Sequence, residues 1–181
     1  RNLSKIKGRI GFRGYTKSDL VSEGHGALVL GGKNILSNKL DLTDRTYLTW
    51  EKFHESPEIK LNKDDIILSQ RGTLGDVAII NVELGSVTIN PSMVVLKGIK
   101  IDPYFLFYQL CGETIQQTIK RITTSTAVPM ISQKQIGEFQ IKYPSLPEQQ
   151  KISDFLTAVD KRIELLEKKK TLLETYKKGI M

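Results

Sequence analysis

Apolar residues recur every seven positions toward the end of the chain. One heptad position holds Ile152, Val159, Leu166, Leu173 and Ile180. The other holds Leu156 and Ile163, then Lys170 and Lys177 in place of apolar residues. The flanking residues that widen this stripe are Phe155, Leu165, Leu172 and Tyr176. Such a helix is expected to bury its seam against a partner helix. At about 1.5 Å per residue it would be roughly 45 Å long, too long to lie wholly on a small domain.

The two lysines in the seam favour one direction of pairing. A parallel self-dimer would place Lys170 against Lys170, and like charges in a seam repel each other. An antiparallel arrangement avoids this contact, and the aliphatic stems of the lysines can still cover apolar surface. We therefore expect antiparallel helix pairing.

Short apolar runs before residue 100 predict strands. Ile66–Gln70 and Val77–Ile80 flank a glycine-containing loop, Arg71–Asp76, which indicates a strand–loop–strand unit. Met93–Lys97 predicts a further strand, and alternation over Phe139–Tyr143 predicts a final one.

Helix signals lie between and after these strands. Thr49–Glu55 is a short helical candidate stopped by Pro57. Asp102 followed by Pro103 is a good helix start, with the helix running from Tyr104 to about Arg121. Capping-box spacings predict two more helix starts, at Ser132 with Gln135 and at Ser145 with Glu148. The expected fold class is α+β: a mixed-sheet globular domain over residues 1–144, then a long coiled-coil-forming helix over 145–181.

Length and composition are those of an ordinary core-forming protein. The chain has 181 residues, of which 39% are hydrophobic, enough for one domain plus the helix. No window approaches the roughly 18 apolar residues that a membrane span needs. Cys111 is the only cysteine, which excludes an intrachain disulfide and a cysteine-based zinc site. We expect a cytoplasmic protein.

The net charge of +7 favours a polyanionic partner. Six basic residues lie within the first twenty against Asp19 alone: Arg1, Lys5, Lys7, Arg9, Arg13 and Lys17. Glycines and aromatics between them, such as Gly14 and Tyr15, suit close backbone approach and stacking. Solvated surface lysines are the alternative explanation.

Enzyme-like signals are weak. Asn90-Pro91-Ser92 lacks the second proline and the aromatic residue of adenine methyltransferase motifs. Glu58 with Lys60, and Glu138 with Lys142, are carboxylate–lysine pairs of the kind nucleases place around magnesium, but solvated loops explain them better. His25 and His54 have no partners at metal-ligand spacing, so no metal site is expected.

Four segments, taken together and in order, resemble the target-recognition domain of specificity subunits of type I restriction–modification enzymes. They are Gly8-Arg9-Ile10-Gly11-Phe12-Arg13-Gly14-Tyr15-Thr16, Asp65-Ile66-Ile67-Leu68-Ser69-Gln70-Arg71-Gly72-Thr73-Leu74-Gly75, Val128-Pro129-Met130-Ile131-Ser132 and Leu146-Pro147-Glu148-Gln149-Gln150-Lys151-Ile152. The last segment and its heptads resemble the spacer helix of that family. The usual subunit has two recognition domains and two antiparallel spacer helices, so this chain resembles a half-subunit or a fragment.

The resemblance implies a non-catalytic reader of one half of a bipartite double-stranded DNA target. Its partners would be methyltransferase and restriction subunits and a second specificity half, or a second copy, paired through the helix. S-adenosylmethionine, magnesium and ATP would bind those partner subunits and no cofactor this chain. The candidate DNA-binding residues are Arg9, Arg13, Tyr15, Lys17, Arg71, Thr73, Thr124 and Ser125.

Two other function classes stay open at this point. One is a small magnesium-dependent nuclease using Glu58 and Lys60. The other is a scaffold whose helix recruits a protein and whose basic face is incidental.

Overall fold

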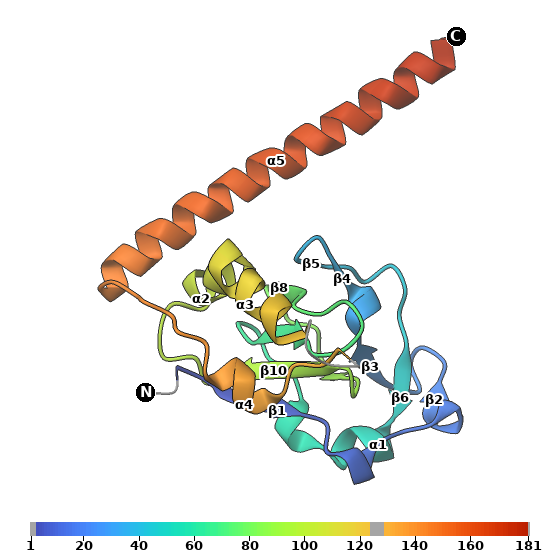
Figure 1. The fold of residues 1–181 in the computed structure, drawn as a ribbon. Helices are drawn as coiled ribbons and strands as arrows, with labels where there is room; N and C mark the ends of the chain where they lie inside the picture. Colours follow the sequence, from blue (N-terminus) through green and yellow to red (C-terminus); the bar gives the residue numbers. More distant parts are fainter. Residues whose placement is uncertain (1–2, 124–128, 181) are drawn as a thin grey trace. The chain divides into compact units, whose positions relative to one another are not determined.

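The computed structural model describes residues 3–123 and 129–180. The chain divides into two compact units, Arg1–Lys142 and Tyr143–Met181. The first contains sheets and short helices and the second a long helix (Figure 1). The α+β prediction is therefore confirmed.

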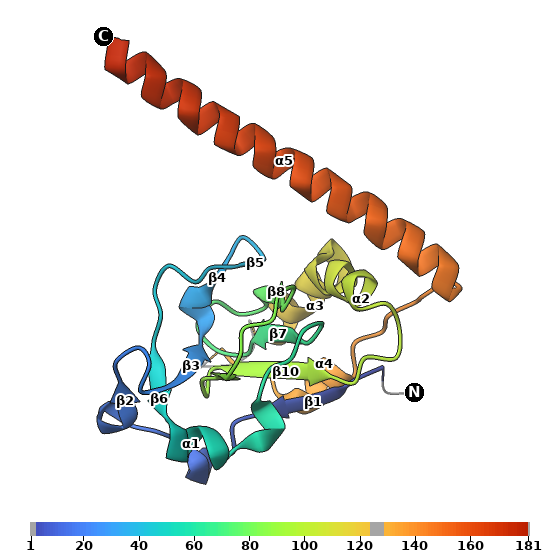
Figure 2. The ribbon, with the colours of Figure 1, turned by 180° about the vertical axis from the view of Figure 1, so that it is seen from behind.

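The central sheet of the globular unit has four antiparallel strands. Their order is β1 (Lys5–Gly8), β10 (Met93–Lys97), β7 (Ile66–Ser69) and β8 (Val77–Ile79). The view from behind shows β10 between β1 and β7 (Figure 2). The predicted strands on both sides of Arg71 and over residues 93–97 are confirmed.

A second sheet is mixed. Its order is β2 (Leu20–Val21), β6 (Tyr47–Thr49), β3 (Gly26–Leu30) and β9 (Val87–Ile89), and only the β3–β9 pair is parallel. A small hairpin joins β4 (Ile35–Leu36) to β5 (Lys39–Leu40). Four short 3-10 helices lie in the connections: η1 (Gly11–Arg13), η2 (Lys17–Asp19), η3 (Gly32–Asn34) and η4 (Pro57–Ile59).

The central sheet is buried on both faces, because its strands contribute side chains to two separate hydrophobic clusters. On β7, Ile66 and Leu68 join a cluster with the helices, whereas Ile67 joins a cluster with β3 and β9 of the second sheet. This division follows the period-two geometry of a strand, in which successive side chains point to opposite faces. It explains why the sequence there is continuously apolar rather than alternating.

Helices α2 (Pro103–Cys111) and α3 (Glu113–Thr123) pack beside β8 (Figure 1). The predicted start is confirmed, since the Asp102 carboxylate accepts from the Phe105 backbone N–H at 2.7 Å and Pro103 follows the cap. The prediction of one helix to Arg121 is wrong, because Gly112 is extended at φ −67° and ψ 151° and separates the two. Glycine is a poor helix former, and the break lets α3 turn Ile115 and Ile119 into the core.

The other short helices agree with their sequence signals. Helix α1 (Trp50–His54) ends before Pro57, and α4 (Gln133–Gly137) begins after the capping box of Ser132 and Gln135. The predicted strand over Phe139–Tyr143 is wrong: this described segment pairs with no strand. Phe139 and Ile141 are partly buried against the helix-side core. Alternate burial thus produces a period-two pattern in an unpaired segment.

The second unit is α5 (Leu146–Ile180), which has 35 residues and would be about 52 Å long at 1.5 Å per residue. One half of the predicted capping box is formed, since the Glu148 carboxylate accepts from the Ser145 N–H at 3.0 Å, and it also accepts from the Ser145 hydroxyl at 2.6 Å. These bonds lower the pKa of Glu148. The first heptad position is 39–66% exposed in every member, Ile152 through Ile180. Within the described residues, no helix is both long and apolar enough to cross a bilayer.

Candidate nucleic-acid interface

Strand register brings several loops to one end of the globular unit. Gly8 pairs with Val94, and Met93 pairs with Ser69, so the connections after β1, after β7 and before β10 leave the central sheet together. In the second sheet the parallel pair of Leu30 with Ile89 ends at matching positions. We call the segments 31–34, 70–76, 90–92 and 129–131 the loop end.

The loop between β7 and β8 is closed by its own hydrogen bonds. The Ser69 hydroxyl donates to the Arg71 carbonyl at 2.8 Å, and the Gly75 N–H donates to the Ser69 carbonyl at 3.0 Å. Gly72 and Gly75 have φ of +79° and +85°, a left-handed conformation that glycine adopts without a Cβ penalty. The loop is therefore a defined turn with Arg71 and Thr73 exposed on it.

Neighbouring segments hold this loop in place. The Gln70 side chain donates to the Pro91 carbonyl at 3.0 Å, and its backbone N–H to the Ser92 carbonyl at 2.9 Å. Arg71 forms an isolated antiparallel bridge with Met130, and its Nε lies 3.1 Å from the Met130 sulfur. The exposed arginine is thus presented from a scaffold fixed on two sides.

The Asn90–Ser92 segment has a structural role in this scaffold. The Asn90 side-chain oxygen accepts from the Ser92 N–H at 2.9 Å and from its hydroxyl at 2.6 Å. This is an Asx turn, a local hydrogen-bonding pattern that asparagine favours in loops. It shapes the carbonyl positions to which Gln70 binds.

Arg9 lies inside the domain. It is only 8% exposed, and its guanidinium lies 3.4 Å from the Ile89 carbonyl, 3.4 Å from the Thr88 hydroxyl and 3.5 Å from the Ser56 hydroxyl. Its Cζ lies 5.3 Å from the centre of the Tyr15 ring. Burial lowers the pKa of Arg9 and raises that of Tyr15. We therefore assign Arg9 a structural role and remove it from the candidate contact set.

None of the other N-terminal candidates belongs to the segments of the loop end. Arg13 donates to the Glu55 carbonyl at 2.8 Å and lies 3.5 Å from the Glu58 carboxylate. Tyr15 is half-buried beside Arg9, and Lys17 is exposed on η2. Because Leu20 pairs with Leu48 near the start of β3, η2 lies at the end of the second sheet opposite Gly31. Thr124 and Ser125 lie outside the described residues.

Sequence reasoning missed Gln116, which joins α3 to the Arg71 loop. Its Nε2 donates to the Gly75 carbonyl at 2.9 Å and to the Leu110 carbonyl at 2.8 Å. A Cβ at Gly75 would lie 2.9 Å from the Gln116 oxygen. The one signal in the sequence is Gly75 itself, because a glycine in a turn allows a positive φ and a close approach by a neighbouring side chain.

The residues of the nuclease alternative have separate partners. Glu58 lies beside Arg13, whereas the Lys60 ammonium lies 4.4 Å from the centre of the Phe53 ring and 3.2 Å from His54 Nδ1. Across residues 3–123 and 129–180, no three histidine, cysteine or carboxylate side chains gather as a metal site would require.

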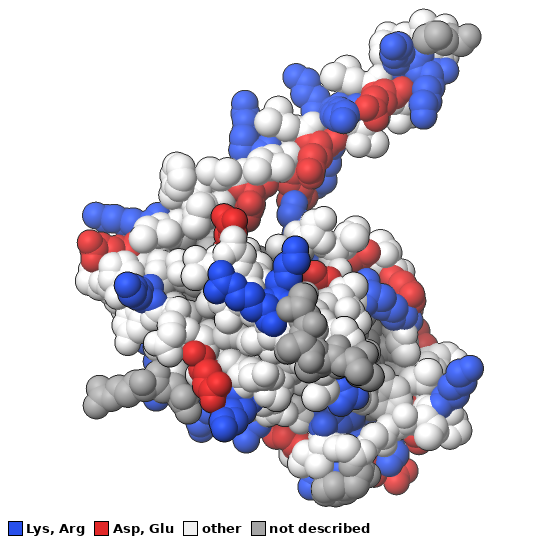
Figure 3. Space-filling view, viewed as in Figure 1, with Lys and Arg blue, Asp and Glu red and all other residues white. Residues whose placement is uncertain are grey.

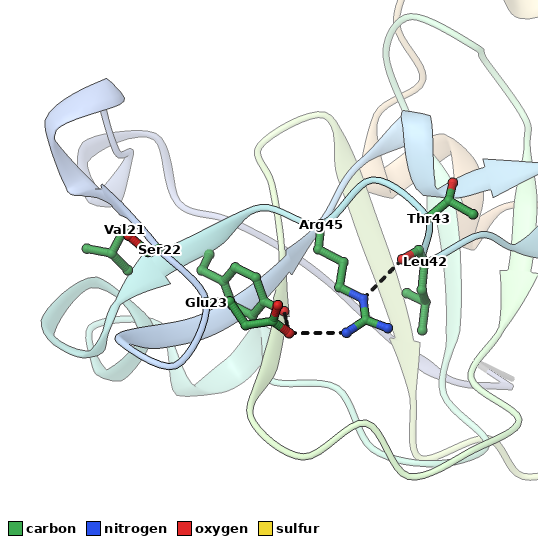
Figure 4. Close-up of a pocket in the computed structure, with 7 residues that line it drawn as sticks. Val21, Ser22, Glu23, Leu42, Thr43 and Arg45 are labelled. Carbon is green, nitrogen blue, oxygen red and sulfur yellow. Dashed lines mark hydrogen bonds and ion pairs between the residues drawn. The ribbon is translucent and has the colours of Figure 1, made fainter.

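A hollow beside β2 and β6 contains charged side chains that bind one another. Its lining residues are Val21, Ser22, Glu23, Leu42, Thr43, Arg45 and Tyr47. The Glu23 carboxylate accepts from Tyr47 at 2.5 Å and Arg45 at 3.2 Å, and Figure 4 shows Arg45 reaching toward it. The Tyr47 hydrogen bond, with that from Arg45, lowers the pKa of Glu23. These mutual contacts leave the loop end as the stronger candidate.

We expect Arg9→Ala to lower the free energy of unfolding, by roughly 1–3 kcal/mol for loss of buried bonds to a charged group. Lys17→Ala, at an exposed position, should change it by less than about 0.5 kcal/mol. Urea denaturation of the two variants measures the difference. Unchanged stability in the Arg9 variant, together with weakened DNA binding, would return Arg9 to the contact set.

A family model described as the type I restriction modification DNA specificity domain matches residues 29–175. A putative type I restriction enzyme MjaX specificity subunit of Methanocaldococcus jannaschii is 30% identical over 170 residues, covering 91% of this chain and 36% of that protein.

Two solved structures share the fold. One, from a study of complex assembly and conformational transition of the type I R-M system, has a TM-score of 0.68 at 18% identity and covers 91% of this chain and 37% of that one. The HsdS subunit from Thermoanaerobacter tengcongensis has a TM-score of 0.66 at 18% identity, covering 92% and 37%.

The fold is that of a specificity-subunit recognition domain followed by a long helix. The chain belongs to the type I restriction modification DNA specificity domain family. It spans 26–36% of the length of the curated relatives it matches.

Proposed function

We propose that the globular unit reads one half of a bipartite double-stranded DNA target, with the loop end as its reading surface. The observation that carries this is the exposed Arg71, held by Gln70, Ser92 and Met130 on a closed turn. An arginine can address guanine O6 and N7 with two hydrogen bonds, or hold a phosphate. A fixed backbone supports either contact, since its ordering cost is met on folding rather than on binding.

The proposed role of α5 is to pair, antiparallel, with the spacer helix of a second specificity half or a second copy. Its exposed heptad residues need a partner. In such an assembly the distance between two readers becomes the distance between two half-sites. Methyltransferase and restriction subunits would bind this assembly and carry S-adenosylmethionine, magnesium and ATP, so this chain would act without catalysis.

Selection of duplexes from a random-sequence pool by the full chain tests the reading function. We expect an enriched short motif that binds more tightly than its scrambled version in a salt titration. Both affinities should fall with salt, because phosphate contacts release counterions. A pool that stays random after selection, or equal affinities for the two duplexes, would favour a scaffold; sequence-specific cleavage by the chain with magnesium alone would favour a nuclease.

A further inference from the structure

Helix α3 lies directly beside the Arg71 loop. A groove separates them, lined by Leu74 from the loop and by Glu113, Gln116, Gln117, Ile119, Lys120 and Thr123 from the helix. Gln116 spans this junction by donating to the Gly75 carbonyl. The position of α3 is thus tied to that of Arg71 through the loop itself.

The exposed part of α3 becomes basic toward its C-terminal end. Ile115 and Ile119 are buried, whereas Lys120 and Arg121 in the last turn are exposed. The carboxylate of Glu113 lies about two turns away at the helix start, where it accepts from Gln117 at 2.8 Å. Figure 3 shows Lys and Arg side chains on the face of the globular unit that carries α3.

The last turn of α3 itself borders this groove, since Lys120 and Thr123 line it together with Leu74. The Arg71 loop therefore has the last turn of α3 as a neighbour. Basic side chains beside a base-reading loop suit phosphates, which set the position of a protein on the duplex without carrying sequence information.

We propose that the last turn of α3, through Lys120 and Arg121, contacts the DNA backbone next to the half-site that Arg71 addresses, with Gln116 fixing the separation of the two contacts. This inference rests on the proposed DNA-reading function. An ordinary structural explanation competes with it, because cations near a helix C-terminus also stabilise the helix dipole.

The experiment compares two double variants of the full chain that remove the same charge. Lys120→Gln with Arg121→Gln changes the proposed contact. Lys63→Gln with Lys100→Gln changes two exposed lysines at the opposite end of the central sheet, before β7 and after β10. Binding to a random-sequence duplex is measured from low to moderate salt, since a backbone contact does not depend on sequence.

For the first double variant we expect weaker binding and a salt slope, in log K against log salt, reduced by about 0.9 per lost phosphate contact, up to about 1.8. The control should keep its slope within a few tenths. Equal slopes in the two variants would overturn the inference, as would a variant that loses stability in urea without losing more affinity than the control.

Selection from the random-sequence pool, run beside the salt titration, separates this inference from the proposed function. If the wild-type chain enriches a motif from a random pool but the α3 variant matches its control, the reading function stands and the α3 contact fails. If the wild-type chain enriches no motif, the reading function itself fails.

Discussion

Replacing Leu166 and Leu173 with glutamate should abolish assembly through α5 while leaving the globular unit folded. Both leucines lie in the exposed heptad position, at 52% and 57% exposure. A two-fold helix pair buries the exposed half of four such side chains, each half worth roughly 0.8–1.5 kcal/mol, so their loss removes about 3–6 kcal/mol. Glutamate adds the cost of placing charge in the seam, and together these terms remove much of the roughly 8.2 kcal/mol that corresponds to micromolar affinity.

Light scattering measures the molar mass of the assembly, and circular dichroism with urea denaturation reports on the fold. Thr171→Glu with Thr175→Glu is the matched control, since both threonines are exposed on α5 outside the heptad positions. This control adds the same charge to the same helix and should keep the wild-type mass. A Leu166/Leu173 variant with unchanged mass would show that the seam is not the site of pairing.

The elements that could be predicted from sequence are those whose signal is local. The strands around Arg71 are continuous apolar runs closed by a glycine turn, and each buries both faces. Helix α5 begins where the Glu148 carboxylate accepts from the Ser145 N–H, as the capping-box spacing predicts, and it repeats its apolar residues every seven positions. Propensity, capping and periodicity agree in these segments, so tertiary packing had nothing to override.

The errors lie where tertiary contacts decide. The break at Gly112 depends on α3 packing Ile115 and Ile119 into a core that the local pattern does not define. The 139–143 segment shows the alternation of a strand without a partner strand. Both cases illustrate that periodicity reports which side of a segment is buried, but not what buries it.

The candidate site was predictable only in part, for the same reason. Arg71 could be proposed as a DNA contact because residues at the tip of a glycine turn are normally exposed. The burial of Arg9 could not, since its partners Ser56, Thr88 and Ile89 are 47 to 80 residues away. The contact between Gln116 and Gly75 crosses 41 residues. Fold topology, rather than motif spacing, determines these neighbours.

Arg71→Ala should weaken binding to the selected motif by about 1–3 kcal/mol, or roughly 5- to 150-fold, if the side chain reads a base. Affinity for the scrambled duplex should fall much less, because a base contact adds little to non-specific binding. Competition binding with both duplexes measures the two losses. Urea denaturation should show little change, as Arg71 is exposed and its backbone bonds remain.

Arg71→Lys distinguishes a base contact from a phosphate contact. Lysine keeps the charge but lacks the planar pair of donors that guanine O6 and N7 accept. For a base contact, the lysine variant should lose preference for the motif nearly as far as the alanine variant does, and the motif enriched from a random pool should relax at one position. For a phosphate contact, lysine should restore most of the affinity and the motif should stay intact. Full preference in the alanine variant would remove Arg71 from the reading surface and shift the search to Thr73 and the segments beside it.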